Sequence, residues 1–249
     1  MATAKLDGLA AAAMLHAPSL AIGAAAASAV LAGALLAAGV VGQAPVYTIE
    51  QAPRAPEPTA VSDATYLANG SPFLGDPGAP VTIVEFGDYQ CQACNRFFHQ
   101  TEEELVRRFI DTGQARLIFK DFNIIGPDSV TASHGAHCAT EQGRFWEFHD
   151  TVYGRWDGEN TGWASRENLE MMAAEAGLDV PRWSECVDVG RYAGIIVASN
   201  HDARSVLNLG GTPAFFVIGP GGTTQISGAQ PIEAFERAIA AQLGADAAG

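Results

Sequence analysis

The sequence predicts an α/β domain whose strands are interrupted by a helix-rich block, preceded by an apolar membrane segment and a linker. Three observations support this prediction. Residues 20–41 carry no charge, prolines recur between residues 45 and 80, and the remainder alternates short apolar runs with helical periodicity. The apolar content of 48% and charged content of 17% are typical of a folded protein rather than of a disordered one.

The charge balance of the chain excludes a nucleic-acid-binding function. The 28 acidic residues against 14 Lys and Arg give a formal charge of −14, so the cations that neutralise phosphates are too few. Lysine occurs only at positions 5 and 120, and the sequence has no basic cluster for an anionic membrane surface. Any attachment to a membrane must therefore be hydrophobic.

The N-terminal part is predicted to contain a short segment at 1–19, a membrane segment at 20–41 and a Pro-rich linker at 42–70. The apolar segment is long enough to cross a bilayer as a helix and exceeds the usual apolar region of a signal peptide. We favour an uncleaved anchor, although its small residues also allow cleavage as a signal. Because Lys5 precedes the segment and the next basic residue is Arg54, the remainder is expected outside the cytoplasm.

The folded domain is predicted to span residues 71–249. Apolar runs, helical periodicity and turn residues predict, in order, a strand at 81–86, a helix at 91–110, a strand at 117–120, a helix-rich block at 128–207, a hairpin of strands at 214–218 and 223–227, and a terminal helix from Pro231. The expected order is therefore β, α, β, helical block, β, β, α.

A Cys-X-X-Cys motif lies where the first buried strand gives way to a helix, with Gln92 and Ala93 between Cys91 and Cys94. Unpaired N–H groups and the positive end of the helix dipole at this place favour a thiolate. Cys91 is therefore predicted to have a lowered pKa and to act as the nucleophile. Cys94, one turn later, can attack a mixed disulfide at Cys91 and resolve it.

Two other interpretations of the motif are half of a zinc site and an inert structural disulfide. A zinc site needs two further ligands, and the nearest candidates are His99, His134, His137 and Cys138. Because no second Cys-X-X-Cys pair accompanies them, we favour a redox pair without a metal. The chain also lacks a phosphate-binding glycine loop, a Ser/His/Asp order and a nucleotide fingerprint, so no organic cofactor is predicted.

A second motif, Gly210-Gly211-Thr212-Pro213, immediately precedes the strand at 214–218. A proline at the entry to a buried strand is acceptable as an ordinary trans residue, and a cis bond in a tight turn is the other usual arrangement. Because a Cys-X-X-Cys motif follows a strand elsewhere in the same chain, we favour a cis bond between Thr212 and Pro213.

Four stretches together resemble the DsbA-like branch of the thioredoxin superfamily, the thiol-disulfide oxidoreductases of oxidising compartments. They are residues 79–86 (APVTIVEF), 88–94 (DYQCQAC), 141–149 (EQGRFWEFH) and 211–217 (GTPAFFV). The resemblance implies a thioredoxin-like fold with an inserted helical domain, which agrees with the helix-rich block. It also implies that cis-Pro213 lies beside Cys91, and that Thr212 offers backbone hydrogen bonds to an extended substrate.

The resemblance further implies a catalytic role for Glu85, which lies in an apolar strand where an unpaired charge is unfavourable. In the family, an acid at this place lies beneath the buried cysteine and assists proton transfer. The alternative is a structural ion pair between Glu85 and Lys120, and both roles are compatible.

A second cysteine pair, Cys138 and Cys186, falls within the helix-rich block. Some members of the resembling family carry a structural disulfide in the inserted domain, and pairing is expected in an exported chain. Two buried free thiols, packed as small apolar residues, are the alternative.

The resemblance implies that the chain forms or exchanges disulfides in exported proteins. A membrane enzyme, quinone-linked and DsbB-like or similar to vitamin K epoxide reductase, would reoxidise it. The domain would be anchored outside the cytoplasm, or secreted if the segment at 20–41 is cleaved.

The two residues between the cysteines depart from the family. Its best-known oxidants have Pro-His there and thioredoxins have Gly-Pro, whereas this chain has Gln92-Ala93. We therefore expect a Cys91 pKa less depressed than in the strongest oxidants. A reductase or isomerase remains an alternative, as does a metal-binding chaperone that uses Cys91, Cys94 and a histidine.

Overall fold

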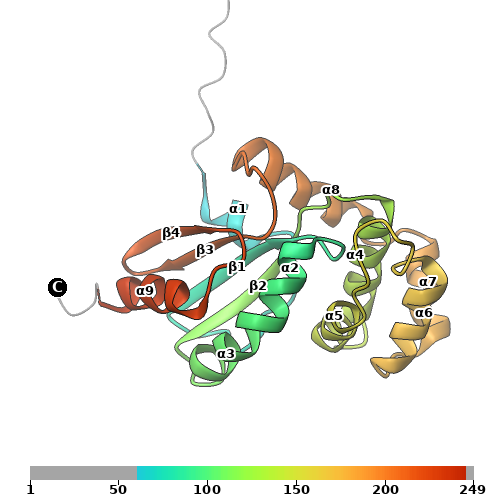
Figure 1. Ribbon diagram of the computed structural model, residues 1–249, viewed down its shortest axis with the longest axis horizontal. Coiled ribbons are helices and arrows are strands. Elements are labelled where there is room, and N and C mark those ends of the chain that lie inside the picture. The colour runs from blue at the N-terminus through green and yellow to red at the C-terminus, as the bar shows by residue number, and fades with distance from the viewer. Residues whose placement is uncertain (1–60, 245–249) are drawn as a thin grey trace, which may run out of the picture. The chain divides into compact units, whose positions relative to one another are not determined.

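The computed structural model describes residues 61–244 of the chain (Figure 1). The predicted segments at 1–19 and 20–41, and the first part of the linker predicted at 42–70, lie outside the described residues. None of the helices at 61–244 combines the length and the apolar character that a bilayer crossing requires.

A four-stranded sheet in the order β2-β1-β3-β4 lies at the centre of the domain. β1 (Val81–Gly87) runs parallel to β2 (Ala115–Asp121) and antiparallel to β3 (Ala214–Gly219), which turns back into β4 (Gly222–Ser227). Every residue of β1 is buried because both of its neighbours are strands and both faces of the sheet are covered. The mostly apolar run in its sequence, interrupted by Thr82 and Glu85, is the pattern of such a central strand.

One face of the sheet packs against a continuous helical run and the C-terminal helix. The run consists of α2 (Gln92–Phe97), the π-helical η1 (Phe98–Glu102), α3 (Glu103–Leu105) and the π-helical η2 (Val106–Ile110), and the C-terminal helix is α9 (Ile232–Leu243). Because side chains alternate along a strand, the odd-numbered residues of β1 point to this face. Glu85 therefore lies on the same face as the helix that follows the Cys-X-X-Cys motif.

The opposite face is covered by the short helix α1 (Asp63–Leu67) and the π-helical η3 (Asp202–Val206). Figure 1 shows α1 on one side of the sheet and α3 and α9 on the other. The side chain of Tyr66 packs on Phe216 with ring centroids 4.8 Å apart. The folded domain thus begins earlier than the predicted residue 71, because part of the predicted linker closes this face of the sheet.

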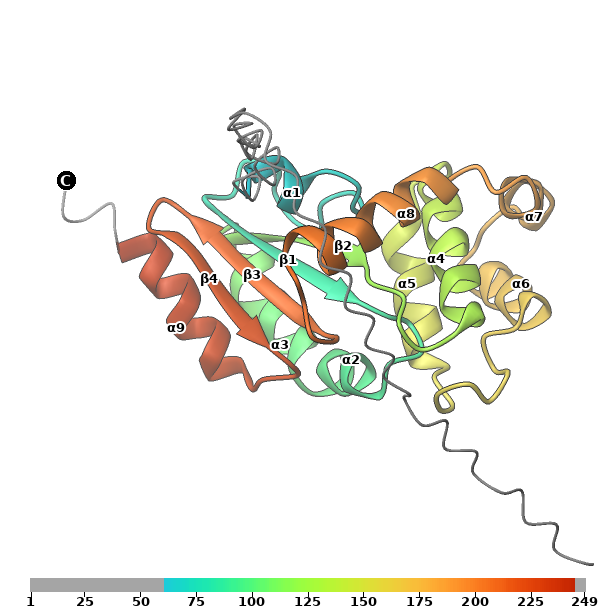
Figure 2. The ribbon, with the colours of Figure 1, turned by 90° about the horizontal axis from the view of Figure 1, so that it is seen from above.

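A block of helices separates β2 from β3, as the sequence predicts. It contains α4 (Pro127–Thr140), α5 (Phe145–Gly154), α6 (Arg166–Glu175), α7 (Val180–Asp188) and α8 (Ala193–His201), followed by η3. In Figure 2 these helices gather beside the carboxyl end of β1. The aromatic core of the block, around Phe148 and Trp183, continues into the active site, because Tyr89 and Cys94 belong to the same buried cluster. A disulfide between Cys138 and Cys186 joins α4 to α7.

Candidate active site

The structure brings together cysteines and a proline motif that lie more than a hundred residues apart. Cys91 occupies the N-cap of α2 and Cys94 lies one turn further on, and both are free thiols. The Cys91 Sγ lies 3.5 Å from the carbonyl oxygen of Thr212, and the Thr212–Pro213 peptide bond is cis. The loop before β3 therefore faces the first turn of α2.

The two thiols differ in their environments. Cys91 is 6% exposed, whereas Cys94 is fully buried. Hydrogen bonding from the Cys94 thiol, and then from the Thr212 side chain and the backbone N–H groups of Cys94 and Ala93, outweighs burial and lowers the pKa of Cys91 to about 6. Burial raises the pKa of Cys94 well above its ordinary value. At neutral pH, Cys91 is a thiolate and Cys94 a neutral thiol that donates to it.

Glu85 lies in the middle of β1, beneath α2, with 2% of its surface exposed. Burial, followed by the negative charges of Glu102 and Cys91, raises the pKa of Glu85 well above the ordinary range of a carboxyl group. The protonated form of the carboxyl group is therefore favoured over the charged form. A buried acid that carries a proton can exchange it with a neighbouring group whose charge changes during a reaction.

The alternative ion pair between Glu85 and Lys120 is wrong. Lys120 is in register with Phe86, so its side chain points to the opposite face of the sheet from Glu85. Its ammonium group donates to Asp202 Oδ2 at 2.8 Å, and to the carbonyl oxygens of Thr65 at 2.7 Å and Ala68 at 2.6 Å. These three acceptors satisfy the buried cation without Glu85.

Asp88 is a site residue that the sequence analysis did not identify. It is fully buried in the turn between β1 and α2. Its Oδ1 accepts from the N–H of Gln90 at 2.8 Å, and its Oδ2 accepts from the N–H groups of Ile124 and Ile125 at 2.7 and 2.9 Å. The carboxylate therefore fixes the turn that precedes Cys91 to the loop that follows β2.

The helical block also holds this turn in place. Trp156 Nε1 donates to the carbonyl oxygen of Gln90 at 2.8 Å, and the Tyr153 hydroxyl donates to that of Asp88 at 3.3 Å. Glu159 accepts the N–H of Gln92 at 2.9 Å, so one free N–H of the first turn of α2 is already occupied. No local sequence pattern indicates these contacts, because their partners are about 65 residues away along the chain.

Two of the four additional zinc ligands considered from the sequence, His137 and Cys138, are engaged elsewhere. Cys138 is in the disulfide with Cys186, and His137 Nε2 lies 2.7 Å from Asp121 Oδ2. The groups that surround Cys91 and Cys94 are instead backbone amides, the loop that carries Thr212 and the buried acid Glu85. These groups are typical of a dithiol site.

We predict that Cys94→Ala raises the pKa of Cys91 from about 6 toward the ordinary value of a cysteine, 9.0, because it removes the strongest contribution to the lowered pKa. The thiolate is populated above the pKa, so its reactivity near pH 7 should fall in the variant. The pH profile of Cys91 alkylation measures this change. Cys94→Ser is the matched control, because its hydroxyl can still donate a hydrogen bond to the Cys91 sulfur. The pKa of Cys91 should therefore stay partly lowered in this variant. An unchanged profile in Cys94→Ala would contradict this account.

Comparison with known proteins agrees with the fold and the motif. The family model described as thioredoxin matches residues 68–241. Over 150 residues the chain is 30% identical to the probable disulfide bond formation protein D of Bacillus anthracis, covering 59% of this chain and 69% of that one. The disulfide bond formation protein D of Bacillus subtilis is 28% identical over 151 residues, covering 59% and 68%.

Another relative, the Na(+)/H(+) antiporter NhaA 3 of Salinispora tropica, is 32% identical over 147 residues, which cover 58% of this chain. The chain spans about a fifth of that relative's length, since the match covers 21% of it. The similarity therefore concerns one part of the antiporter sequence.

Solved structures with the same fold include BdbD from Bacillus subtilis, with a TM-score of 0.64 at 23% identity over 70% of this chain and 92% of that one. A thioredoxin-like oxidoreductase from Silicibacter pomeroyi has a TM-score of 0.60 at 26% identity, covering 72% and 96%. The family model covers most of the chain, and the helical block lies between the strands as it does in the DsbA-like fold. The chain therefore belongs to the thioredoxin family, in its DsbA-like branch.

Proposed function

We propose that the chain is a thiol-disulfide oxidoreductase that forms or exchanges disulfide bonds in exported proteins. The observation that carries this proposal is the pairing of a low-pKa thiol, Cys91, with a fully buried thiol of raised pKa, Cys94, in the first turn of one helix. Such a pair accepts or donates two electrons by thiol-disulfide exchange. The relatives named disulfide bond formation protein D support the same assignment.

In the oxidising direction, the reaction starts from a disulfide between Cys91 and Cys94. A substrate thiolate attacks the Cys91 sulfur, the bond between the two cysteines breaks, and Cys94 leaves as a thiolate that takes up a proton. A second substrate thiolate then attacks the mixed disulfide, and Cys91 leaves as a thiolate. The substrate thereby loses two electrons and gains one disulfide, and the dithiol enzyme gains the two electrons.

Glu85 is the proton carrier for Cys94 in this proposal. The negative charge of Cys91 is one of the causes that keep the Glu85 carboxyl protonated. When Cys91 enters a mixed disulfide, that charge disappears, so Glu85 ionises more readily and can accept the proton of Cys94. In the opposite direction, the protonated carboxyl group supplies the proton that the leaving Cys94 thiolate requires.

Thr212 and Pro213 are proposed to position the substrate. Their loop lies against the Cys91 sulfur, and the proline has no N–H to compete for an acceptor. An extended substrate segment that pairs with the backbone at Thr212 would bring its own cysteine to Cys91. The disulfide between Cys138 and Cys186 is proposed to be structural, because it joins two helices of the insertion and is buried.

The location and partners follow from the same proposal. The domain would work outside the cytoplasm, anchored by the apolar segment at residues 20–41 or released if that segment is cleaved. A disulfide donor must be reoxidised after each turnover, so a membrane redox enzyme, quinone-linked and DsbB-like or similar to vitamin K epoxide reductase, would take electrons from Cys91 and Cys94.

The proposed activity predicts that the protein speeds the oxidation of a reduced, unfolded disulfide protein in a glutathione buffer. Cys91→Ser should abolish the acceleration, because it removes the attacking sulfur. Cys94→Ser should instead accumulate a mixed disulfide with the substrate, because this variant has no second active-site thiol to attack the mixed disulfide. Mass spectrometry of the quenched reaction distinguishes the two variants. Full activity in Cys91→Ser would refute the assignment of the redox pair.

Glu85→Gln is predicted to slow the attack of Cys94 on a mixed disulfide by about 100-fold, the lower end of general acid–base effects, and to leave the first attack by Cys91 largely intact. The amide keeps the shape of the side chain but cannot accept the proton. Stopped-flow measurement of the two phases tests this separation. Equal rates of Cys94 attack on the mixed disulfide in the wild type and in Glu85→Gln would contradict the proton-transfer role of Glu85.

A further inference from the structure

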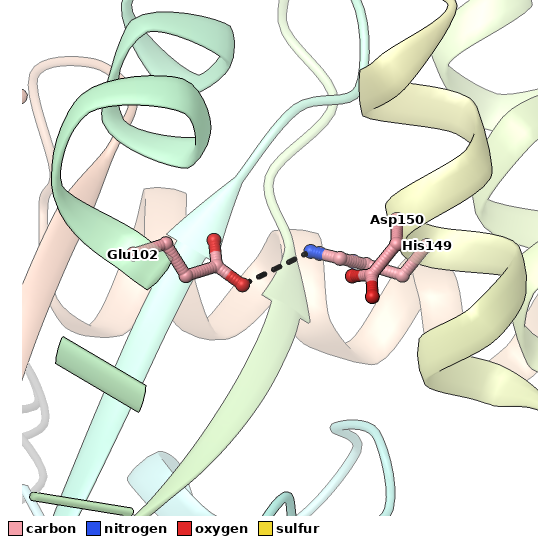
Figure 3. Close-up of side chains that lie close together, drawn as sticks. All are labelled: Glu102, His149 and Asp150. Atoms are coloured by element: carbon pink, nitrogen blue, oxygen red, sulfur yellow. Dashed lines mark ion pairs between the residues drawn. The ribbon is translucent and has the colours of Figure 1, made fainter. Parts of the chain in front are cut away.

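Three side chains that commonly bind metals meet between the sheet-packed helical run and the helical block, and the proposed disulfide exchange uses none of them. Glu102 comes from η1, while His149 and Asp150 come from α5. One ligand atom from each lies within 4.8 Å of the others. Figure 3 shows Glu102 facing the ring nitrogen of His149 across the gap between the two helices.

His149 has a ring nitrogen without a partner although the residue is 1% exposed. Its Nδ1 lies 3.1 Å from the Tyr89 hydroxyl oxygen, whereas Nε2 makes no hydrogen bond within the described residues. Nε2 faces Glu102 Oε1 at 4.0 Å, which is too long for a hydrogen bond. A buried polar atom of this kind needs a partner. Because Nε2 points toward Glu102, that partner would lie between His149 and Glu102.

Burial opposes charge on the groups at this gap, so a metal ion must displace a proton from Glu102 in order to bind. Burial lowers the pKa of His149 to about 3, and it raises the pKa of Glu102 to about 8 and that of Asp150 to about 6. Within residues 61–244, no Lys or Arg forms an ion pair with Glu102 or Asp150; Arg107, which lines the same cavity, pairs with Glu104 at 2.6 Å. Once the proton of Glu102 is displaced, one divalent cation would balance the two carboxylates.

The cluster is also accessible from solvent. Glu102 and Asp150 line a cavity of about 570 Å³, and Asp150 is exposed. A hydrated ion can therefore reach the carboxylates through the cavity and exchange its water for the His149 nitrogen. Two ligands bound to the same tetrahedral ion at about 2.0–2.2 Å lie about 3.3–3.6 Å apart, so the 4.0 Å between His149 and Glu102 requires only a small closure.

We propose that Glu102, His149 and Asp150 form a binding site for a divalent transition-metal ion, for which Zn²⁺ is the best match. One imidazole and two carboxylates are ligands that Zn²⁺ accepts, and three protein ligands leave the fourth position to water. The Tyr89 hydroxyl would orient the ring through Nδ1, as outer-sphere groups do for metal-bound histidines. The ion would tie η1 to α5 and so join the helical run that carries Cys91 to the inserted helices.

The test uses the whole protein in its oxidised form, treated with a chelator and then dialysed. All four cysteines are then in disulfides and cannot bind the metal. Titration calorimetry with Zn²⁺ is expected to give one ion per chain, and Co²⁺ to give the absorption bands of a site without sulfur ligands. Zn²⁺ should also raise the temperature of thermal unfolding, because it binds the folded state.

Asp150→Asn and Glu102→Gln are each expected to weaken Zn²⁺ binding at least about tenfold. Asp150→Asn is the decisive variant, because the exposed residue can change without disturbing the core. Glu103→Gln and Asp111→Asn are the matched controls, since they alter acids that line the same cavity outside the cluster. Absence of stoichiometric binding, or equal affinity in the wild type and in Asp150→Asn, would overturn the proposal. Neither outcome bears on the disulfide chemistry of Cys91 and Cys94, so the two proposals fail independently.

Discussion

The hydrogen bonds around the Cys91 sulfur are the interaction on which the rest of the site depends. They lower the pKa of this thiol to about 6 even though burial opposes the charge. The same arrangement leaves Cys94 buried and neutral, so one helical turn contains a nucleophile and a proton-bearing partner. A stabilised thiolate favours the dithiol over the disulfide, and this preference makes such a pair an acceptor of electrons from other thiols.

The first turn of α2 keeps this geometry because three separate parts of the chain hold it. Asp88 ties the preceding turn to the loop after β2, the loop at Thr212 lies against the sulfur, and Trp156 of the helical block binds the carbonyl oxygen of Gln90. The insertion is therefore part of the active-site framework, and its core is continuous with the buried residues around Cys94. A cation at Glu102 and His149 would add a further connection between the helical run that begins at Cys91 and the helical block.

Local sequence patterns predicted the elements and the reacting cysteines, because each is encoded within a few residues. The apolar run of β1 implies a buried central strand, and the Cys-X-X-Cys spacing places two thiols in one helical turn. Local patterns could not predict the contacts of Asp88, Glu159 and Trp156, because each contact joins segments that are far apart in the sequence. Strand register explains the failure with Lys120: its pairing with Phe86 directs it away from Glu85, and a sequence of apolar residues does not specify that pairing.

The reduction potential of the Cys91–Cys94 pair, measured by equilibrating the protein in glutathione buffers and counting free thiols, tests the central claim most directly. A Cys91 pKa of about 6 lies between the roughly 3.5 of DsbA and 7 of thioredoxin. We therefore predict a potential between their values of about −120 and −270 mV. A potential at or below that of thioredoxin would contradict this prediction, because the pair would then act as a reductant and would not drive disulfide formation in other proteins.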